Sequence, residues 1–253
     1  SKGFYKTSDF AIKANGTSLE PDSDGNYAVQ VLGDIQIVVE GVAQEAALAA
    51  PVVDTHGYHS DWTADDVTLT PVTTADSGIA YYEYSKDNGA NWTKLTGDSL
   101  TVSESFFATD YIFRAVSNAG NVSAPSSSVV VKIDKLPLTV TLSGNTQDYL
   151  QTDTLQIWVN IGLSGYSRLE IKNADGSWTA INPSDEFLNP IEYTITENGT
   201  YTFRAVSGAG VVGKEESITY TRIDSVKPIV VINSDGYESG TWTNQNVILS
   251  VSN

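Results

Sequence analysis

The sequence of 253 residues contains no cysteine and no methionine. Without cysteine the chain can form no disulfide, no zinc–thiolate site and no thiol nucleophile. No stretch approaches the roughly 20 consecutive apolar residues that cross a bilayer as a helix, so we expect no membrane insertion. Because there is no initiating methionine and no signal peptide, we expect these residues to belong to a larger parent chain.

Basic residues are also scarce. Lys and Arg together number 14 against 31 Asp and Glu, which gives a formal net charge of −17. A surface with this charge repels phosphate groups, so the sequence predicts no nucleic-acid partner and no binding to an anionic membrane surface. The acids are scattered along the chain, a distribution that favours solubility over an acidic interaction tail.

The residues that are abundant favour β-structure. Hydrophobic residues make up 40% of the chain and charged residues 18%, a balance that can fill cores and is too weakly charged for a disordered polyelectrolyte. Residues 1–46 alternate between apolar and polar and turn at Asn15-Gly16 and Asp24-Gly25. We expect a small β-meander of about four short strands there, the closing part of a preceding β-repeat.

One phrase occurs twice and organises the rest of the chain. Residues 111–122 begin Tyr-Ile-Phe-Arg-Ala-Val-Ser, residues 201–212 begin Tyr-Thr-Phe-Arg-Ala-Val-Ser, and Phe203 follows Phe113 by 90 residues. Each copy shows about seven apolar stretches with turn signals every 8–12 residues, the pattern of an immunoglobulin-like sandwich. The predicted fold is therefore all-β, with tandem immunoglobulin-like sandwiches at 47–136 and 137–226, preceded by the meander (1–46) and followed by a truncated third repeat (227–253).

The repeated phrase also suggests a specific role for its tyrosine. Immunoglobulin domains place a corner tyrosine two residues before the second cysteine of their sixth strand, and its hydroxyl bonds back to the main chain. Tyr111 has this spacing, with Phe113 and Phe203 at the cysteine positions. The alternative is that Tyr111 is an ordinary core residue.

These residues carry a family resemblance. The run from Gly78 to Trp92, the phrase Phe-Arg-Ala-Val-Ser-Asn-Ala-Gly-Asn and the sequence Val-Lys-Ile-Asp resemble the bacterial immunoglobulin-like repeats of Gram-positive cell-surface and secreted proteins. The resemblance covers about residues 50–253 and weakens in the second repeat. It implies stalk, spacer or adhesin modules without catalysis, at an extracellular location.

A second pattern allows another interpretation. Ser85-x-Asp87-x-Gly89-x-x-Trp92 fits the Asp-box hairpin of sialidase propellers. A propeller needs four to eight blades, and a 90-residue period is wrong for one. We therefore predict a structural hairpin here and no enzyme.

The alternation of apolar residues indicates candidate binding residues on the outer faces of the strands. Trp158 lies between Ile157 and Val159, so a strand whose apolar residues face the core turns Trp158 outward, where it could stack on a sugar or seat a partner. Tyr81 is a weaker case of the same kind. Packing against an adjoining domain is the alternative for Trp158.

A metal site is the other possibility. Asp134 and Asp224 occupy equivalent places at the ends of the two repeats, and carboxylate oxygens at such junctions could bind calcium. The neighbouring sequence lacks a dense ladder of acids, and solvated linker carboxylates are the alternative. We predict no other cofactor.

Taken together, these features favour a non-catalytic extracellular segment that acts as a stalk, spacer or adhesion module of a bacterial surface protein, with an unknown protein or glycan ligand. The alternative is a carbohydrate-binding accessory module of a secreted glycoside hydrolase. No motif in the sequence identifies a reaction.

Overall fold

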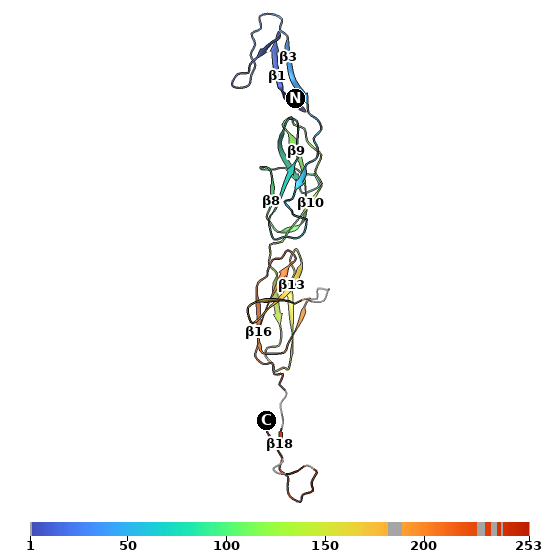
Figure 1. The fold of residues 1–253 in the computed structure, drawn as a ribbon, viewed down its shortest axis with the longest axis vertical. Coiled ribbons are helices and arrows are strands. Elements are labelled where there is room, and N and C mark those ends of the chain that lie inside the picture. Colours follow the sequence, from blue (N-terminus) through green and yellow to red (C-terminus); the bar gives the residue numbers. More distant parts are fainter. Residues whose placement is uncertain (1, 182–188, 227–230, 234–236, 239, 253) are drawn as a thin grey trace. The chain divides into compact units, whose positions relative to one another are not determined.

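The computed structural model describes residues 2–181, 189–226, 231–233, 237–238 and 240–252, and the regular elements in these ranges are all β-strands (Figure 1). No helix long and apolar enough to cross a membrane occurs among them. The chain divides into two compact units. The first comprises Ser1–Leu136 with the loop residues Gly162–Gly165 and Ser207–Val211, and the second comprises Pro137–Ile161, Tyr166–Val206 and Val212–Asn253.

Seven strands follow Pro51 and form two sheets. One sheet has the order β4-β5-β8 and the other the order β10-β9-β6-β7. The strands are β4 (Val52–Asp54), β5 (Val67–Val72), β6 (Ile79–Ser85), β7 (Thr93–Lys94), β8 (Leu100–Val102), β9 (Phe106–Ser117) and β10 (Val129–Ile133).

The next seven strands repeat this order. They form the sheets β11-β12-β15 and β14-β13-β16-β17, so the first, second and fifth strands of each copy make one sheet and the other four make the second. This arrangement confirms the predicted tandem immunoglobulin-like sandwiches. The strands are β11 (Thr139–Ser143), β12 (Asp153–Asn160), β13 (Tyr166–Lys172), β14 (Trp178–Ile181), β15 (Ile191–Ile195), β16 (Gly199–Ser207) and β17 (Glu216–Tyr220).

Each sandwich has a hydrophobic core of its own. The first core is built around Leu69, Phe113 and Ile133, and the second around Leu155, Ile157 and Phe203, all fully buried. Inward residues alternate with exposed ones along β12, as expected for a strand with one face in the core. The two cores share no residue.

The repeated phrase is explained by what each of its side chains contacts. Phe113 is completely buried in the first core. Arg114 points to the outer face, where its Nε lies 2.6 Å from a Glu83 carboxylate oxygen and its guanidinium stacks 4.2 Å from the ring of Trp92. The Ser117 hydroxyl accepts a hydrogen bond from the Asn121 N–H and so closes the turn after the strand.

The second copy reproduces these contacts. Arg204 lies 2.7 Å from Glu170 and stacks 3.9 Å from Trp178, and the Ser207 hydroxyl accepts a hydrogen bond from the Val211 N–H. Phe203 is completely buried. The phrase recurs because one strand must at once fill the core, hold the arginine–tryptophan stack and close a turn.

Among the described residues, the hydrogen bond of a corner tyrosine is made in the second sandwich and not in the first. The Tyr201 hydroxyl donates to the carbonyl of Glu197, four residues upstream, at 2.9 Å. Among the hydrogen bonds of the described residues, none involves the Tyr111 hydroxyl, although the Tyr111 side chain is only 1% exposed. The corner prediction for Tyr111 is therefore wrong, and Tyr111 is a residue of the first core, which was the alternative.

The Asp-box sequence forms the predicted hairpin turn. Asp87 accepts hydrogen bonds from the Ser85 hydroxyl (2.6 Å) and from the main-chain and side-chain nitrogens of Asn91 (2.9 and 2.6 Å). The Ser85 hydroxyl, the Asn91 N–H and the Asn91 side chain, in that order, lower the pKa of Asp87 to about 2. The carboxylate thus stays charged and ties the turn between β6 and β7.

The N-terminal segment forms a single sheet of three strands in the order β2-β1-β3. These are β1 (Phe4–Ala14), β2 (Thr17–Leu19) and β3 (Ile37–Gln44). Asn15 (φ 48°) and Gly16 (φ 82°) both have positive φ, as the tight hairpin between β1 and β2 requires.

The fourth strand expected in the meander is absent from this described segment. Tyr27 makes only an isolated bridge to Pro21, and Val31 is 63% exposed. The reason is that β3 pairs with β1 directly, which leaves the residues before β3 without a neighbouring strand. Opposite a bulge in β1, Gly41 has a φ of 66°, and a Cβ there would lie 2.4 Å from the Phe10 main chain, so glycine is required.

After residue 226 the structure describes two short strands, β18 (Val231–Asn233) and β19 (Ser250–Ser252), which pair antiparallel. The predicted start of a third repeat (227–253) falls partly on residues 227–230, 234–236, 239 and 253, which lie outside the described residues. That prediction therefore stays a prediction.

Candidate functional site

At the end of each sandwich, in or just after its last strand, the chain makes a parallel contact with a segment that precedes the second strand. In the first sandwich, the Thr63 N–H donates to Lys132 O (3.2 Å) and the Asp134 N–H donates to Thr63 O (2.9 Å). In the second, the Leu150 N–H donates to Arg222 O (3.1 Å) and the Asp224 N–H donates to Leu150 O (2.8 Å). Both pairs are parallel bridges, Thr63 with Ile133 and Leu150 with Ile223.

Two buried carboxylates occupy matching places in the first compact unit. Glu45 is 6% exposed and accepts hydrogen bonds from the Ser77 hydroxyl (2.6 Å), the Ser77 N–H (3.1 Å) and the Ser117 hydroxyl (2.5 Å). Burial raises the pKa of Glu45, but the hydrogen bonds from Ser117 and Ser77 outweigh it and hold the pKa below its ordinary value.

Asp134 repeats this contact. It is completely buried and accepts hydrogen bonds from the Ser164 hydroxyl (2.6 Å), the Ser164 N–H (2.9 Å) and the Leu136 N–H (3.1 Å). Burial raises the pKa of Asp134, and the hydrogen bonds from Ser164 and Leu136 more than offset this, so that the pKa is lowered. The two serines, in turn, accept hydrogen bonds from Ala119 N–H and Ala209 N–H.

The predicted calcium candidates, Asp134 and Asp224, therefore differ in environment. The oxygens of Asp134 face N–H and O–H donors, whereas Asp224 is exposed and its carboxylate accepts from the Val226 N–H at 3.2 Å. Among the described residues, no group of three or more His, Cys, Asp or Glu side chains is arranged to hold a metal. Calcium binding at these positions stays a prediction.

Sequence reasoning missed Glu45 and the two serines. A signal was available, because Ser77-Gly78 and Ser164-Gly165 precede the third strand of their repeats by the same distance. Asp134 was singled out from the sequence as a calcium candidate, but Glu45 could not be found by comparing the repeats, because it lies outside both of them.

The structure places Trp158 on the outer face of the sheet β11-β12-β15, where it is 44% exposed. It pairs with Thr141 on β11. We call the exposed residues of these three strands the Trp158 face, and Glu192 is the one charged side chain among them. They are Thr139, Thr141, Ser143, Thr154, Gln156, Trp158, Asn160, Glu192 and Thr194.

Tyr81 is less suited to binding. It is half-buried on β6, and the Lys94 ammonium lies 4.2 Å from the centroid of its ring. One face of the ring is thus already covered by a cation. Tyr81 and Trp158 lie in different compact units.

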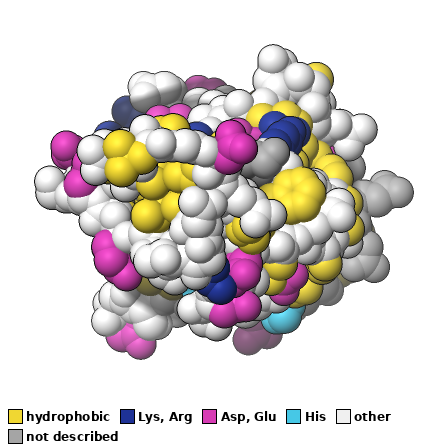
Figure 2. Space-filling view, turned by 90° about the horizontal axis from the view of Figure 1, so that it is seen from above, with side chains coloured by type: hydrophobic (Ala, Val, Ile, Leu, Met, Phe, Trp, Pro, Cys, Tyr) yellow, Lys and Arg dark blue, Asp and Glu magenta, His cyan; other side chains and the backbone are white. Residues whose placement is uncertain are grey.

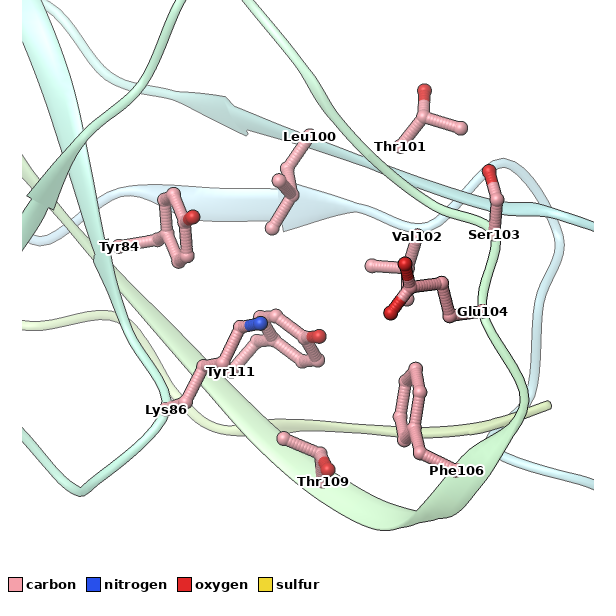
Figure 3. Close-up of a pocket in the computed structure, with 10 residues that line it drawn as sticks. All are labelled: Tyr84, Lys86, Leu100, Thr101, Val102, Ser103, Glu104, Phe106, Thr109 and Tyr111. Atoms are coloured by element: carbon pink, nitrogen blue, oxygen red, sulfur yellow. The ribbon is translucent and has the colours of Figure 1, made fainter.

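A cavity of about 560 Å³ opens in the first sandwich beside β8 (Figure 3). Its walls carry the rings of Tyr84, Phe106 and Tyr111, with the Lys86 ammonium beside the Tyr111 ring at 5.5 Å. Figure 3 shows the Tyr111 hydroxyl directed into the cavity, toward the region between Glu104 and Phe106. Burial is the main cause that raises the pKa of Tyr111, and the carboxylate of Glu104 acts in the same direction, so this hydroxyl stays protonated.

Acidic side chains occur at several places on the face seen in Figure 2. On the face seen in Figure 2, Asp and Glu side chains stand apart from one another among neutral groups, with few basic side chains between them. A polyanion such as a nucleic acid would find no basic patch on this face.

No protein-family model matches the chain, and no curated protein matches it. Among solved structures, fibronectin(III)-like modules of CbhA from Clostridium thermocellum align at 12% identity and a TM-score of 0.36, covering 69% of this chain and 95% of theirs. A tetra-tandem repeat from the extending region of a large adhesion protein aligns at 14% identity and 0.31, covering 96% and 79%. A 1.5-MDa bacterial ice-binding adhesin aligns at 14% and 0.33, covering 74% and 69%. All three TM-scores are low, so the fold assignment depends on the strand order described above.

Proposed function

We propose that this chain is a non-catalytic spacer segment of an extracellular bacterial surface protein, in which the sandwiches hold a distal part of the parent chain away from the cell. The observation that carries the proposal is the parallel contact at the end of each sandwich. Two segments that run in the same direction are loaded in shear when the chain is pulled from its ends. Their hydrogen bonds then resist together instead of breaking one after another.

Other features support the same role. The two cores are separate, so each sandwich can bear tension as its own unit. The buried Glu45 and Asp134 repeat one contact, each accepting a hydrogen bond from a serine hydroxyl, of Ser77 and of Ser164. The cysteine-free cores need no oxidising compartment to fold, a property compatible with a bacterial wall.

Pulling on single molecules of the full chain tests this role. We expect two unfolding events, each releasing roughly 30 nm, because about 90 residues extend by ~3.6 Å each. Thr63→Pro removes the N–H that bonds Lys132, and Leu150→Pro removes its counterpart in the second sandwich. Each single variant should weaken one of the two events, and the double variant both. A single unfolding event, or forces unchanged in the double variant, would contradict the proposal.

A second candidate function has one specific observation in its favour, the Trp158 face. An exposed indole among hydroxyl and amide side chains suits a neutral sugar, which offers a C–H face for stacking and hydroxyls for hydrogen bonds. The function would be that of a carbohydrate-binding accessory module, which could also serve adhesion. Solved carbohydrate-binding modules of the β-sandwich superfamily are among the structures that align, at 10% identity and a TM-score of 0.28.

For this function, Trp158→Ala should weaken binding to a neutral glycan at least tenfold, about 1.4 kcal/mol. The measurement is a glycan array followed by titration of intrinsic fluorescence. Trp242→Ala is the matched control, since Trp242 is fully exposed at 102% in the C-terminal segment and outside this face. Glycan binding that is lost equally in both variants, or kept in Trp158→Ala, would exclude the Trp158 face as the site.

A further inference from the structure

The cavity of the first sandwich lies beside positions at which the second sandwich has larger side chains. Strand register gives the equivalent positions. Val102 on β8 pairs with Val67, and Tyr193 on β15 pairs with Leu155, the equivalent inward residue of the second strand. A valine in the first sandwich therefore stands where the second has a tyrosine.

At two more positions the first sandwich has a smaller or more polar residue than the second. Val131 on β10 pairs with Thr109, and Tyr220 on β17 pairs with Gly199, two residues before the shared tyrosine of each phrase. Glu104 lies two residues after Val102, as Ile195 lies two residues after Tyr193. The second sandwich thus contains two tyrosines and a buried isoleucine where the first has two valines and an exposed glutamate.

The second sandwich shows what these rings do when present. Tyr193 packs on Tyr201 and Phe203 with centroids 6.2 and 5.4 Å apart, and Tyr201 packs edge-on against Tyr220 at 6.1 Å. The Tyr220 hydroxyl donates to Asp153 at 2.6 Å. Each of these four aromatic rings therefore packs against another ring. In the first sandwich Tyr84 packs on Tyr111 and Phe113 with centroids 6.4 Å apart in both pairs. Two valines stand where the second sandwich has Tyr193 and Tyr220, and the half-buried Tyr84 and Phe106 line the cavity.

The polar groups around this cavity are available to contact a ligand. Lys86 and Glu104 are exposed, and neither forms an ion pair with the other or with another described residue. The Tyr111 hydroxyl points into the cavity and forms no hydrogen bond with the described residues (Figure 3). The cavity is open to the surface, and its volume of about 560 Å³ falls within the size range of small-molecule sites.

We propose that this cavity binds a small zwitterion with an apolar side chain, of the class of a free amino acid. The apolar part lies against Tyr84 and Phe106. Its carboxylate pairs with Lys86, and its ammonium group pairs with Glu104, with the Tyr111 hydroxyl as a further partner. A zwitterion also carries no net charge into a chain whose formal charge is −17, whereas a plain anion would be repelled.

Three probes with one ring system test the two charge contacts separately. L-Phenylalanine carries both charges, phenethylamine only the ammonium group, and 3-phenylpropionate only the carboxylate. With the full chain, ligand-observed and amide chemical-shift NMR should show saturable binding of L-phenylalanine and binding at least about tenfold weaker for the other two, since each lacks one charged contact. Resonances of β8 and the start of β9 should move. Equal affinity for all three probes, or shifts confined to other strands, would overturn the proposal.

Variants give the second test. Lys86→Gln and Glu104→Gln should each weaken L-phenylalanine binding about tenfold, while Lys214→Gln, which removes one exposed ammonium group from the second sandwich, should leave it unchanged. Val102→Tyr introduces the ring that the second sandwich has and should abolish binding by filling the cavity. If that variant does not fold, the two surface variants still decide the matter. Unchanged binding in both of them, or absence of binding by the unaltered chain up to 10 mM probe, a concentration at which a Kd of about 1 mM is nearly saturated, would refute the site.

Discussion

Phe203→Ala is expected to lower the free energy of unfolding of the second sandwich by about 3–5 kcal/mol. The ring is completely buried in a core with Leu155, Ile157 and Ile195, and it packs edge-on against Tyr193. Its removal leaves a cavity among residues of two facing sheets, which cannot close around it without moving main chain. Differential scanning calorimetry of the full chain measures the loss as a lower melting temperature for one transition.

Phe113→Ala is the matched control, because Phe113 occupies the same place in the first core. Each substitution should shift only the transition of its own sandwich, since the two cores share no residue. The first sandwich already contains an open cavity beside Tyr111, so its neighbours can relax further and Phe113→Ala should cost less than Phe203→Ala. If either substitution lowered the melting temperature of both transitions, the two sandwiches would unfold as one cooperative unit, which would contradict this prediction.

Asp134→Ala is expected to destabilise the chain by about 1–3 kcal/mol, the cost of leaving buried hydrogen-bond donors without an acceptor. The substitution removes the acceptor for the Ser164 hydroxyl, the Ser164 N–H and the Leu136 N–H, around a carboxylate that is completely buried. Chemical denaturation at neutral pH measures the change. Ser164→Ala and the double variant complete a cycle, in which a coupling near zero would show that the two side chains do not stabilise each other.

The pH dependence of the same contact has a definite sign. Hydrogen bonds from Ser164 and Leu136 hold the folded pKa of Asp134 below the ordinary value of 3.8 despite its burial. A lowered carboxyl pKa contributes stability that is fully present above the unfolded pKa and is lost as the pH falls through the folded pKa. The stability difference between the unaltered chain and Asp134→Asn should therefore be constant near neutral pH and shrink below about pH 4. A difference that grows on acidification would contradict the assignment.

Much of the fold could be predicted because its determinants are local. Alternation of apolar residues located the strands of both sandwiches, and it turned Trp158 outward, since side chains on a strand alternate between two faces. The Asp-box turn was equally predictable, because Ser85, Asp87 and Asn91 satisfy one another within seven residues. The fourth meander strand was mispredicted for the opposite reason. Alternation shows that a segment can form a strand, but the strand forms only where a neighbouring strand is available to pair with it. Here β1 pairs with β3, so the segment before β3 has no strand to pair with.

By itself, the sequence determined that two copies of one all-β module follow each other, because a repeated phrase fills a core, stacks an arginine on a tryptophan and closes a turn in both copies. Only the tertiary structure decided where the copies differ. The cavity beside Tyr111 is lined by residues of separate strands, among them Tyr84, Val102 and Tyr111, so it depends on how these strands pack. The contacts of Glu45 and Asp134 with Ser77 and Ser164 join residues about 30 positions apart. Volume and proximity of this kind arise when distant strands pack, and no local pattern records them.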